Sequence, residues 1–533
     1  MNRAAALTTL LLVALITALV SSRLRMSVNP GFMFQEQYGL GYNFAPHLGA
    51  LCDPNPLTGL SGPTSNVTDQ RSLSLLYVAP TKLLRHTIDP YVLHRFLGIT
   101  FFSLTLFGLW GLARTLGFSL LPTTLLIVTV GLSTQLISYL YESKLTITSA
   151  AWFSLTVWCV AAFDRSLRER LLRRAGWLVF ILPLLLASAY ETYVVSRPLA
   201  VVFLGLIGVY LLGSSVVRGH RLSLGAIYLS AVILGGTLLK LLHPHMRFDQ
   251  TLFEGRTESL VTPSGTLFAE WRETVVARLT EIPALFRWSP SYFSSETLNE
   301  AGSLELWLTL ACAAFVTLLA MSGPAGSRTR ALIDEHRRFY LMLFLICGTA
   351  AIVPLLSVTY VRGHRLFGLY IGGAIFLGGL AHSLLQDERP ALRTAVSLIV
   401  SLLISALALY RIPLVLGWHP PAHFTPPYAH QTLAELETLP LPEGIEPIPN
   451  TVLVRVCDQT TPPAWEHFWN AALYVSDYGC KVGGATTRLG CECDSREMTE
   501  GLRGIVCLTR TANDGGISLH SRYIALPPST PNG

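Results

Sequence analysis

Two glutamates beside apolar segments have the residue type and position to do chemistry. Glu36 is the first carboxylate in the chain and lies in the aromatic-rich stretch 29–48, just beyond the first apolar segment. Glu142 lies in the short connector between the third and fourth apolar segments, with Lys144 beside it. A carboxylate at the border between membrane and water can act as a general base or bind a divalent metal. For Glu142, the alternative is an ion pair with Lys144 or a helix cap.

A third connector, residues 358–365, concentrates positive charge between the ninth and tenth apolar segments. It contains Arg362, His364 and Arg365. The planar guanidinium group binds phosphate through two parallel hydrogen bonds, so this connector predicts a clamp for an anionic head group. Contact with ordinary phospholipid is the alternative.

Composition places these residues in a membrane protein. The chain has 533 residues, of which 51% are hydrophobic and 14% charged, whereas a soluble domain carries roughly a quarter charged residues. The formal net charge is +6, and most of the positive residues lie in short connectors on one predicted side of the membrane. This asymmetry indicates membrane orientation and argues against nucleic-acid binding. Apolar runs predict about eleven transmembrane helices. They lie at 4–20, 96–114, 119–138, 145–163, 176–190, 194–213, 223–242, 304–321, 339–357, 366–385 and 394–416. The first is predicted to be a retained span, with a signal peptide as the alternative.

The arginines of the connectors predict the orientation. On one side of the membrane, the short connectors contain only Lys144, Arg362 and Arg365 as basic residues, and Arg197 lies near the start of a span. Glu191 is interpreted as the ion-pair partner of Arg197. The opposite connectors are rich in arginine, which places the N-terminus in the cytoplasm and the C-terminus outside. The arginine-rich connectors contain Arg114, Arg165, Arg168, Arg170, Arg173, Arg174, Arg218, Arg221, Arg328, Arg330, Arg337, Arg338, Arg389 and Arg393.

The predicted fold is an all-α polytopic membrane bundle with extracytoplasmic interfacial helices and a small C-terminal α/β or β domain that contains disulfides. Apolar residues at helical spacing in both long outer loops predict the interfacial helices. Alternation predicts strands at 451–457 and 501–508. The predicted parts are a transmembrane domain at 1–416, with outer loops at 21–95 and 243–303, a proline-rich linker at 417–449 and a small domain at 450–533.

Six cysteines lie in the predicted outer segments, and none lies in an arginine-rich connector. This distribution suits an oxidising compartment and predicts that some of the six form disulfides. A zinc knuckle built from Cys480, Cys491, Cys493 and Cys507 is the alternative, although paired Cys-x-x-Cys spacing is lacking. The other two outer cysteines are Cys52 and Cys457.

This combination resembles the GT-C membrane glycosyltransferases, and among them the polyprenyl-phosphate-sugar-dependent mannosyltransferase- and arabinosyltransferase-like group. The resemblance covers roughly residues 4–416 and rests on topology more than on sequence. It implies that Glu36 is a general base or metal ligand, that Glu142 assists it, and that Arg362 and Arg365 hold the lipid phosphate.

One departure from the family pattern leaves the base open. The family often has an acidic pair in the first outer loop, where this chain has Gln35 before Glu36. The base is therefore either Glu36 or Asp53, and the need for a divalent metal is also open. No cofactor is certain.

The resemblance implies an inverting transfer of a sugar from a polyprenyl-phosphate donor to a glycan, lipid or protein outside the cytoplasm. His364 and Lys144 would join the substrate-binding residues, and membrane lipid is a further expected partner. A bacterial inner membrane is favoured. An endoplasmic reticulum membrane is the alternative, and there Asn66-Val-Thr68 would be a glycosylation sequon.

Two other classes of function compete with this one. A transporter or lipid flippase also places polar residues among spans, but it predicts internal repeats and broken helices that the sequence does not reveal. A noncatalytic scaffold would display the C-terminal domain. Its residues Trp465, Phe468 and Trp469 are candidates for such binding, or for the core of the domain.

Overall fold

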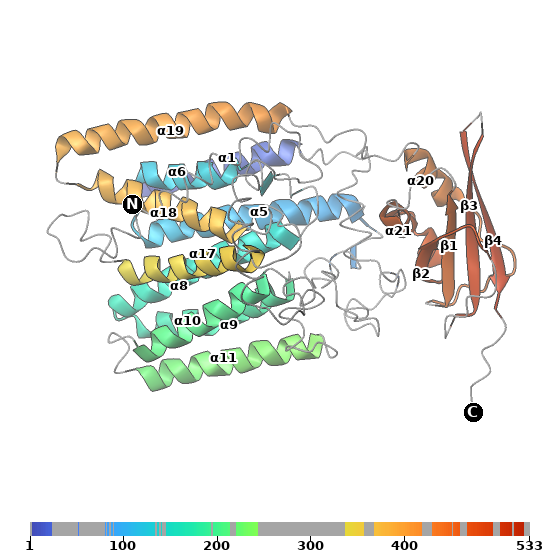
Figure 1. The fold of residues 1–533 in the computed structure, drawn as a ribbon, viewed down its shortest axis with the longest axis horizontal. Coiled ribbons are helices and arrows are strands. Elements are labelled where there is room, and N and C mark those ends of the chain that lie inside the picture. Colours follow the sequence, from blue (N-terminus) through green and yellow to red (C-terminus); the bar gives the residue numbers. More distant parts are fainter. Residues whose placement is uncertain are drawn as a thin grey trace, which may run out of the picture.

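The computed structural model describes a bundle of helices and a C-terminal domain (Figure 1). The described residues are 3–23, 90–133, 145–192, 196–213, 220–242, 336–355, 367–417, 429–458, 466–493 and 502–526, except 388, 450, 514 and 515, together with isolated positions that include Cys52, Leu136 and Ile137.

Ten helices of the described chain lie side by side in the bundle (Figure 1). Seven are long and apolar enough to cross a membrane, and shorter apolar stretches lie in two others. The protein is therefore a multi-pass membrane protein. The helices are α1 (Arg3–Arg23), α5 (Pro90–Thr115), α6 (Leu120–Gly131), α8 (Leu145–Arg168), α9 (Leu172–Thr192), α10 (Ser196–Gly213), α11 (Arg221–Leu242), α17 (Arg337–Leu355), α18 (Phe367–Leu385) and α19 (Pro390–Gly417).

The predicted spans correspond to these helices in order, with two exceptions. The span at 304–321 lies outside the described residues, and the span at 119–138 is wrong in length because α6 has only 12 residues. Helix α1, predicted to be a retained span, packs against α5 and α6. Trp110 Nε1 of α5 donates a hydrogen bond to Thr9 Oγ1 of α1 at 3.1 Å. The predicted interfacial helices lie almost entirely outside the described residues.

Helices α5 and α8 approach each other closely in the middle of the bundle. A Cβ atom added to Gly108 would lie 3.0 Å from the carbonyl carbon of Ser154, so the approach depends on a glycine at this position. Farther along, Trp158 Nε1 donates to Thr115 Oγ1 at 3.1 Å. The two helices run in the same direction, because α6 returns the chain between them.

The N-terminus lies at one end of the bundle, and the C-terminal domain lies beyond the other (Figure 1). Hydrogen bonds join helix termini at the first end. Arg165 Nη1 donates to Thr115 O at 3.3 Å, and the Ser119 N–H donates to His382 Nδ1 at 3.4 Å. We name the two ends the arginine-rich end and the domain end. The first is defined by Arg3, Arg114, Arg165, Arg168, Arg170, Arg173, Arg174, Arg337, Arg338, Arg389 and Arg393.

The C-terminal domain contains a four-stranded sheet of order β2-β1-β3-β4. Strand β1 pairs in parallel with β2 and β3, and β4 is antiparallel to β3. Both predicted strands are confirmed as β1 and β3, and the mixed sheet with helices makes the domain α/β. Its elements are α20 (Ala429–Thr438), β1 (Val452–Asp458), α21 (Glu466–Val475), α22 (Tyr478–Lys481), β2 (Gly484–Leu489), β3 (Gly504–Asn513) and β4 (Gly516–Ala525).

Aromatic side chains of α21 form the core of this domain. Phe468 and Trp469 are 1% and 0% exposed and pack in one cluster with Val454 and Val456 of β1. They are therefore core residues, which removes them as a binding surface for a scaffold. Trp469 Nε1 donates to Asp458 Oδ2 at 3.2 Å.

All six outer cysteines form disulfides: Cys52 with Cys480, Cys457 with Cys491, and Cys493 with Cys507. The prediction of disulfides is confirmed. The zinc alternative is wrong, because its four cysteines are distributed over all three bonds. The bond between Cys52 and Cys480 joins the predicted first outer loop to α22 of the C-terminal domain.

Candidate functional site

The residues predicted to do chemistry all lie outside the described residues. They are Glu36, Glu142, Lys144, Arg362, His364 and Arg365, with Asp53 as the alternative base. The helices next to them are described. Helix α1 ends, and helices α8 and α18 begin, at the domain end of the bundle (Figure 1).

Packing brings the first residues of α18 against α8. Phe367, with which α18 begins, packs edge-to-face on Phe153 of α8, with ring centroids 6.1 Å apart. The connectors that carry Glu142 and Arg365 therefore join helices that are neighbours in space. The bond between Cys52 and Cys480 attaches the predicted first outer loop to the domain at the same end.

Helix α6 ends inside the bundle, about halfway along its neighbours. A Cβ atom added to Gly131, its last residue, would lie 3.1 Å from Ile16 Cγ2 and 3.3 Å from Leu106 Cδ1. Both of those residues lie well inside their own helices, α1 and α5. The end of α6 is thus surrounded by protein at membrane depth.

Serine chemistry explains why the predicted span breaks here. Ser133 Oγ accepts the N–H of Leu136 at 3.4 Å, and the Ser133 carbonyl accepts the N–H of Ile137 at 3.0 Å. A serine hydroxyl that caps a new turn competes with continuation of the old helix. The apolar run 119–138 therefore contains the end of one helix and the start of another turn.

Two side chains stabilise the end of α6. Arg411 Nη1 of α19 and Tyr370 Oη of α18 each donate to the carbonyl oxygen of Thr129 at 2.7 Å. The last carbonyls of a helix have no partner within it, and the hydrocarbon core of a bilayer offers no water to replace one. The three helices α6, α18 and α19 are joined at this oxygen atom.

Sequence reasoning missed Arg411, which is 0% exposed. The available signal was an arginine inside the apolar run 394–416. A charged residue at mid-membrane costs about 2.5–3.5 kcal/mol or more, so it calls for a functional or structural reason. The hydrogen bond to the Thr129 carbonyl gives a structural role to one of the five N–H groups of the Arg411 guanidinium.

Two more buried arginines lie at the domain end. Arg95 of α5 and Arg197 of α10 are each 2% exposed. Arg197 Nε donates to Tyr190 O at 3.3 Å, and its guanidinium lies 5.7 Å from the centre of the Tyr190 ring. The side chain of Glu191, the predicted ion-pair partner of Arg197, is outside the described part of the chain.

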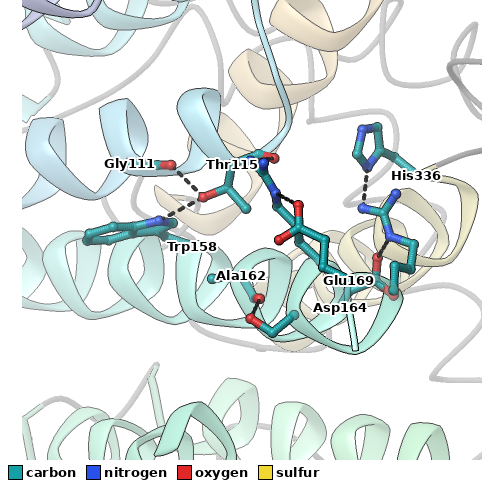
Figure 2. A network of polar contacts seen from close by, with 10 residues as sticks. Gly111, Thr115, Trp158, Ala162, Asp164, Glu169 and His336 are labelled. Atoms are coloured by element: carbon teal, nitrogen blue, oxygen red, sulfur yellow. Dashed lines mark hydrogen bonds and ion pairs between the residues drawn. The ribbon is translucent and has the colours of Figure 1, made fainter. Parts of the chain in front are cut away.

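The arginine-rich end contains a different polar network (Figure 2). Arg168 Nε of α8 lies 3.1 Å from Asp164 Oδ2, and its Nη2 lies 3.2 Å from His336 Nδ1 beside α17. Tyr210 Oη of α10 donates to Asp164 Oδ1 at 2.7 Å. Because Asp164 is 7% exposed, its charge is compensated by these donors. The network connects α8, α10 and α17.

An exposed ion pair also lies at the arginine-rich end. Arg165 Nε lies 2.6 Å from Glu169 Oε1, and both side chains are more than 40% exposed. The hydrogen bond from Arg165 holds the pKa of the Glu169 carboxyl below its ordinary value. Figure 2 shows this pair beside the Thr115 carbonyl, which accepts the second hydrogen bond of Arg165.

Comparison with solved structures gives a structural likeness. No protein-family model and no curated protein matches the sequence. Among solved structures, the chain is similar to the crystal structure of ArnT from Cupriavidus metallidurans in the apo state. The TM-score is 0.47 at 10% sequence identity, over 91% of this chain and 95% of that chain. No functional conclusion follows from a likeness at this level.

The described part of the site offers hydrogen-bond donors and fixed positive charge at the domain end. Within the described residues, no group of three or more His, Cys, Asp or Glu side chains is placed to hold a metal ion. The arrangement around Thr129 positions helices α6, α18 and α19 relative to one another.

Proposed function

We propose that the protein is a membrane glycosyltransferase that moves a sugar from a polyprenyl-phosphate donor to an acceptor at the domain end. The observation that carries the proposal is a convergence of helix termini. The connectors with Glu36, Glu142 and Arg365 adjoin α1, α8 and α18 where these helices meet the domain end (Figure 1). Beside them, α6 stops inside the bundle next to Arg411.

The interrupted helix places polar groups inside the bundle at membrane depth. Non-helical backbone inside a membrane is tolerated only where protein covers it or where it lines an aqueous cavity. Arg411 adds a positive charge whose position is fixed by its bond to Thr129. A charge fixed before the reaction can stabilise a phosphate leaving group without reorganisation.

The proposed roles follow from the chemistry of the residues. Glu36, or Asp53, removes the hydroxyl proton of the acceptor while the acceptor oxygen forms a bond to the anomeric carbon. The bond from that carbon to the phosphate oxygen breaks, and the polyprenyl phosphate leaves with the electron pair. Arg362 and Arg365 hold this phosphate. A single displacement inverts the anomeric configuration.

Glu142, Lys144 and His364 complete the proposed site. Glu142 orients the acceptor or shares a divalent metal with the base, and Lys144 and His364 contact the substrates. Phosphate is a good leaving group, so positioning and charge stabilisation supply most of the acceleration. The acceptor is a glycan, a lipid or a protein.

We also propose that the reaction takes place outside the cytoplasm, at a bacterial inner membrane. Exposed arginines gather at the end of the bundle opposite the domain, which suits a cytoplasmic side. The domain end carries three disulfides, which suit an oxidising compartment.

Substitution of the carboxylates tests the proposal. In Glu36→Gln, turnover of a panel of polyprenyl-phosphate sugars should fall by about a hundredfold or more, with unchanged donor binding, because the amide cannot accept the proton. Glu142→Gln should lose less if it only orients the acceptor, and about as much if both hold a metal.

The matched control is Glu169→Gln, which removes a carboxylate at the arginine-rich end and should leave turnover unchanged. Arg362→Lys and Arg365→Lys should weaken donor binding while expression stays constant, because lysine keeps the charge and loses the planar fork. Parental turnover in both Glu36→Gln and Asp53→Asn would rule out the proposed base.

A transporter or lipid flippase is the second candidate, and one observation favours it. Discontinuous helices such as α6 are typical of transporter binding sites. In that case, membrane vesicles containing the protein would move the lipid-linked sugar between leaflets without breaking its phosphate bond. Glycosyl transfer by purified protein in detergent, where there are no leaflets, separates the two functions.

A further inference from the structure

The turn between α8 and α9 contains an open hollow with a volume of about 600 Å³. Arg170 reverses the chain there with a φ of 57°. The turn lies at the arginine-rich end, at the opposite end of the bundle from the proposed reaction site (Figure 1). Its lining residues are Leu171, Leu172, Arg173, Arg174, Trp177 and Leu178.

The charge of this turn is unbalanced, and two of the excess arginines line the hollow. Asp164 pairs with Arg168, and Glu169 pairs with Arg165, so both described carboxylates of the turn are occupied. Arg173 and Arg174 are exposed. No acidic side chain of the described residues forms an ion pair with either of them. Arg173 and Arg174 therefore line the hollow, are exposed, and carry charge that no described carboxylate pairs with.

The remaining walls are apolar and continue into the surface that faces lipid. Trp177 is 60% exposed, and Leu171 is 45% exposed. Helix α11 packs beside α9, where Ile227 Cδ1 lies 3.5 Å from the position of a Cβ on Gly176. Farther along the membrane, α11 exposes Ile233 by 60%. A tryptophan below two arginines is typical of the level at which lipid head groups meet acyl chains.

We propose that this hollow binds the head group of an anionic phospholipid in the leaflet at the arginine-rich end. Arg173 and Arg174 contact the phosphate, and the acyl chains run along Trp177 and Leu178. A soluble phosphate would gain only the two arginines, whereas a lipid also covers the apolar walls. The site depends on the protein being in a membrane and is independent of the proposed glycosyl transfer.

Lipid binding to the purified full-length protein tests the site. Delipidated protein in neutral detergent is titrated with phosphatidylglycerol or phosphatidylcholine, and bound lipid is counted by native mass spectrometry. The parent should retain one phosphatidylglycerol more tightly than any phosphatidylcholine. The double variant Arg173→Gln, Arg174→Gln should weaken that binding by about tenfold or more, because each arginine contributes attraction to an anionic head group.

The matched control is Arg389→Gln, Arg393→Gln, which removes two exposed arginines at the start of α19 at the same end, one just before the helix and one in its first turn. This control variant should bind phosphatidylglycerol as the parent does, and both double variants should keep the parental unfolding temperature. Equal weakening in the two variants would assign the effect to surface charge in general and overturn the site. Parental affinity in the first variant would also overturn it.

Two further measurements separate the sources of the phosphate group. Trp177→Ala should weaken phosphatidylglycerol binding, because the lipid loses an apolar wall. Inorganic phosphate at millimolar concentration should not displace the lipid. Displacement by phosphate, together with parental lipid binding in Trp177→Ala, would show an anion site that does not recognise lipid and would contradict the proposal.

Discussion

At the arginine-rich end the arginines lie at the surface, whereas Arg95 and Arg197 at the domain end and Arg411 deeper in the bundle are buried. Arg173 and Arg389 are examples of the first kind and are exposed. Arg95, Arg197 and Arg411 are 2%, 2% and 0% exposed. The same residue type therefore serves two different purposes in one bundle.

The two groups of arginines differ in how the free-energy cost of placing a charge in the bundle is offset. Exposed arginines keep their hydration and are screened by salt, so each contributes mainly to orientation and to contacts with lipid. A buried arginine loses its hydration and must recover that free energy from hydrogen bonds. Arg411 does so at the carbonyl of Thr129. Changes at the buried arginines should therefore have larger effects than changes at the exposed ones.

The largest expected effect concerns which end faces the outside. A membrane-impermeant maleimide added to intact cells should label the domain cysteines after reduction, and should label an Arg393→Cys variant only after lysis. The reason is that the two ends lie on opposite sides of the membrane. Labelling without reduction should be near zero, because the six outer cysteines are bonded. The reverse pattern would invert the assignment of the two ends.

The next largest effect is expected for Arg411→Ala. It should lower the free energy of unfolding by about 3 kcal/mol or more, because it removes a hydrogen bond from a charged donor and leaves a cavity where a large, fully buried side chain packed. Unfolding in mixed micelles measures this change. Tyr370→Phe removes the other, uncharged donor and should cost about 1 kcal/mol.

Arg393→Ala is the matched control, because it lies on the same helix and is exposed. It should change the free energy of unfolding by less than about 0.5 kcal/mol. Equal losses in Arg411→Ala and Arg393→Ala would remove the distinction between buried and exposed arginines.

The smallest effect is expected at the Arg165–Glu169 pair. The pKa of Glu169 is lowered in the folded protein by the bond from Arg165. Its contribution to stability is therefore present above the pKa of the unfolded state, about 4.3, and is lost as the pH falls through the lower folded value. Because both side chains are more than 40% exposed, screening keeps the contribution small.

Comparison of the parent with Glu169→Gln at pH 7 and at pH 3 measures the contribution of the Arg165–Glu169 pair to stability. The difference in unfolding temperature should be small at pH 7, shrink further at pH 3, and decrease with added salt. A larger difference at the lower pH would have the wrong sign for a lowered pKa.

The sequence predicts the transmembrane helices well because each needs only an apolar run of sufficient length. It does not predict the end of α6. The run 119–138 stays apolar across the break, and the donors that stabilise the break, Tyr370 and Arg411, come from helices more than two hundred residues away. The amino-acid composition of residues 119–138 therefore cannot predict these contacts.

The cysteines show the same limit. Their distribution predicts disulfides, but six cysteines allow fifteen pairings, and only the folded chain selects Cys52 with Cys480. The sequence allows Phe468 and Trp469 to be either core or surface residues, and the structure shows them buried between α21 and the sheet. The candidate reaction site stays a prediction, because Glu36, Glu142 and Arg365 lie outside the described residues.

The bond between Cys52 and Cys480 also constrains how the protein is made. It closes a ring of sequence separation 428, which encloses every bundle helix of the described chain except α1. The ribosome produces Cys52 early and Cys480 near the end, so the ring can close only after α19 has been inserted and the domain has been delivered to the same side of the membrane. Cys52 therefore cannot form its bond with Cys480 until nearly the whole chain has been synthesised. An oxidised Cys52–Cys480 pair is thus a chemical mark of completed insertion, and a quality-control protease that cuts chains with a free Cys52 would spare only finished molecules.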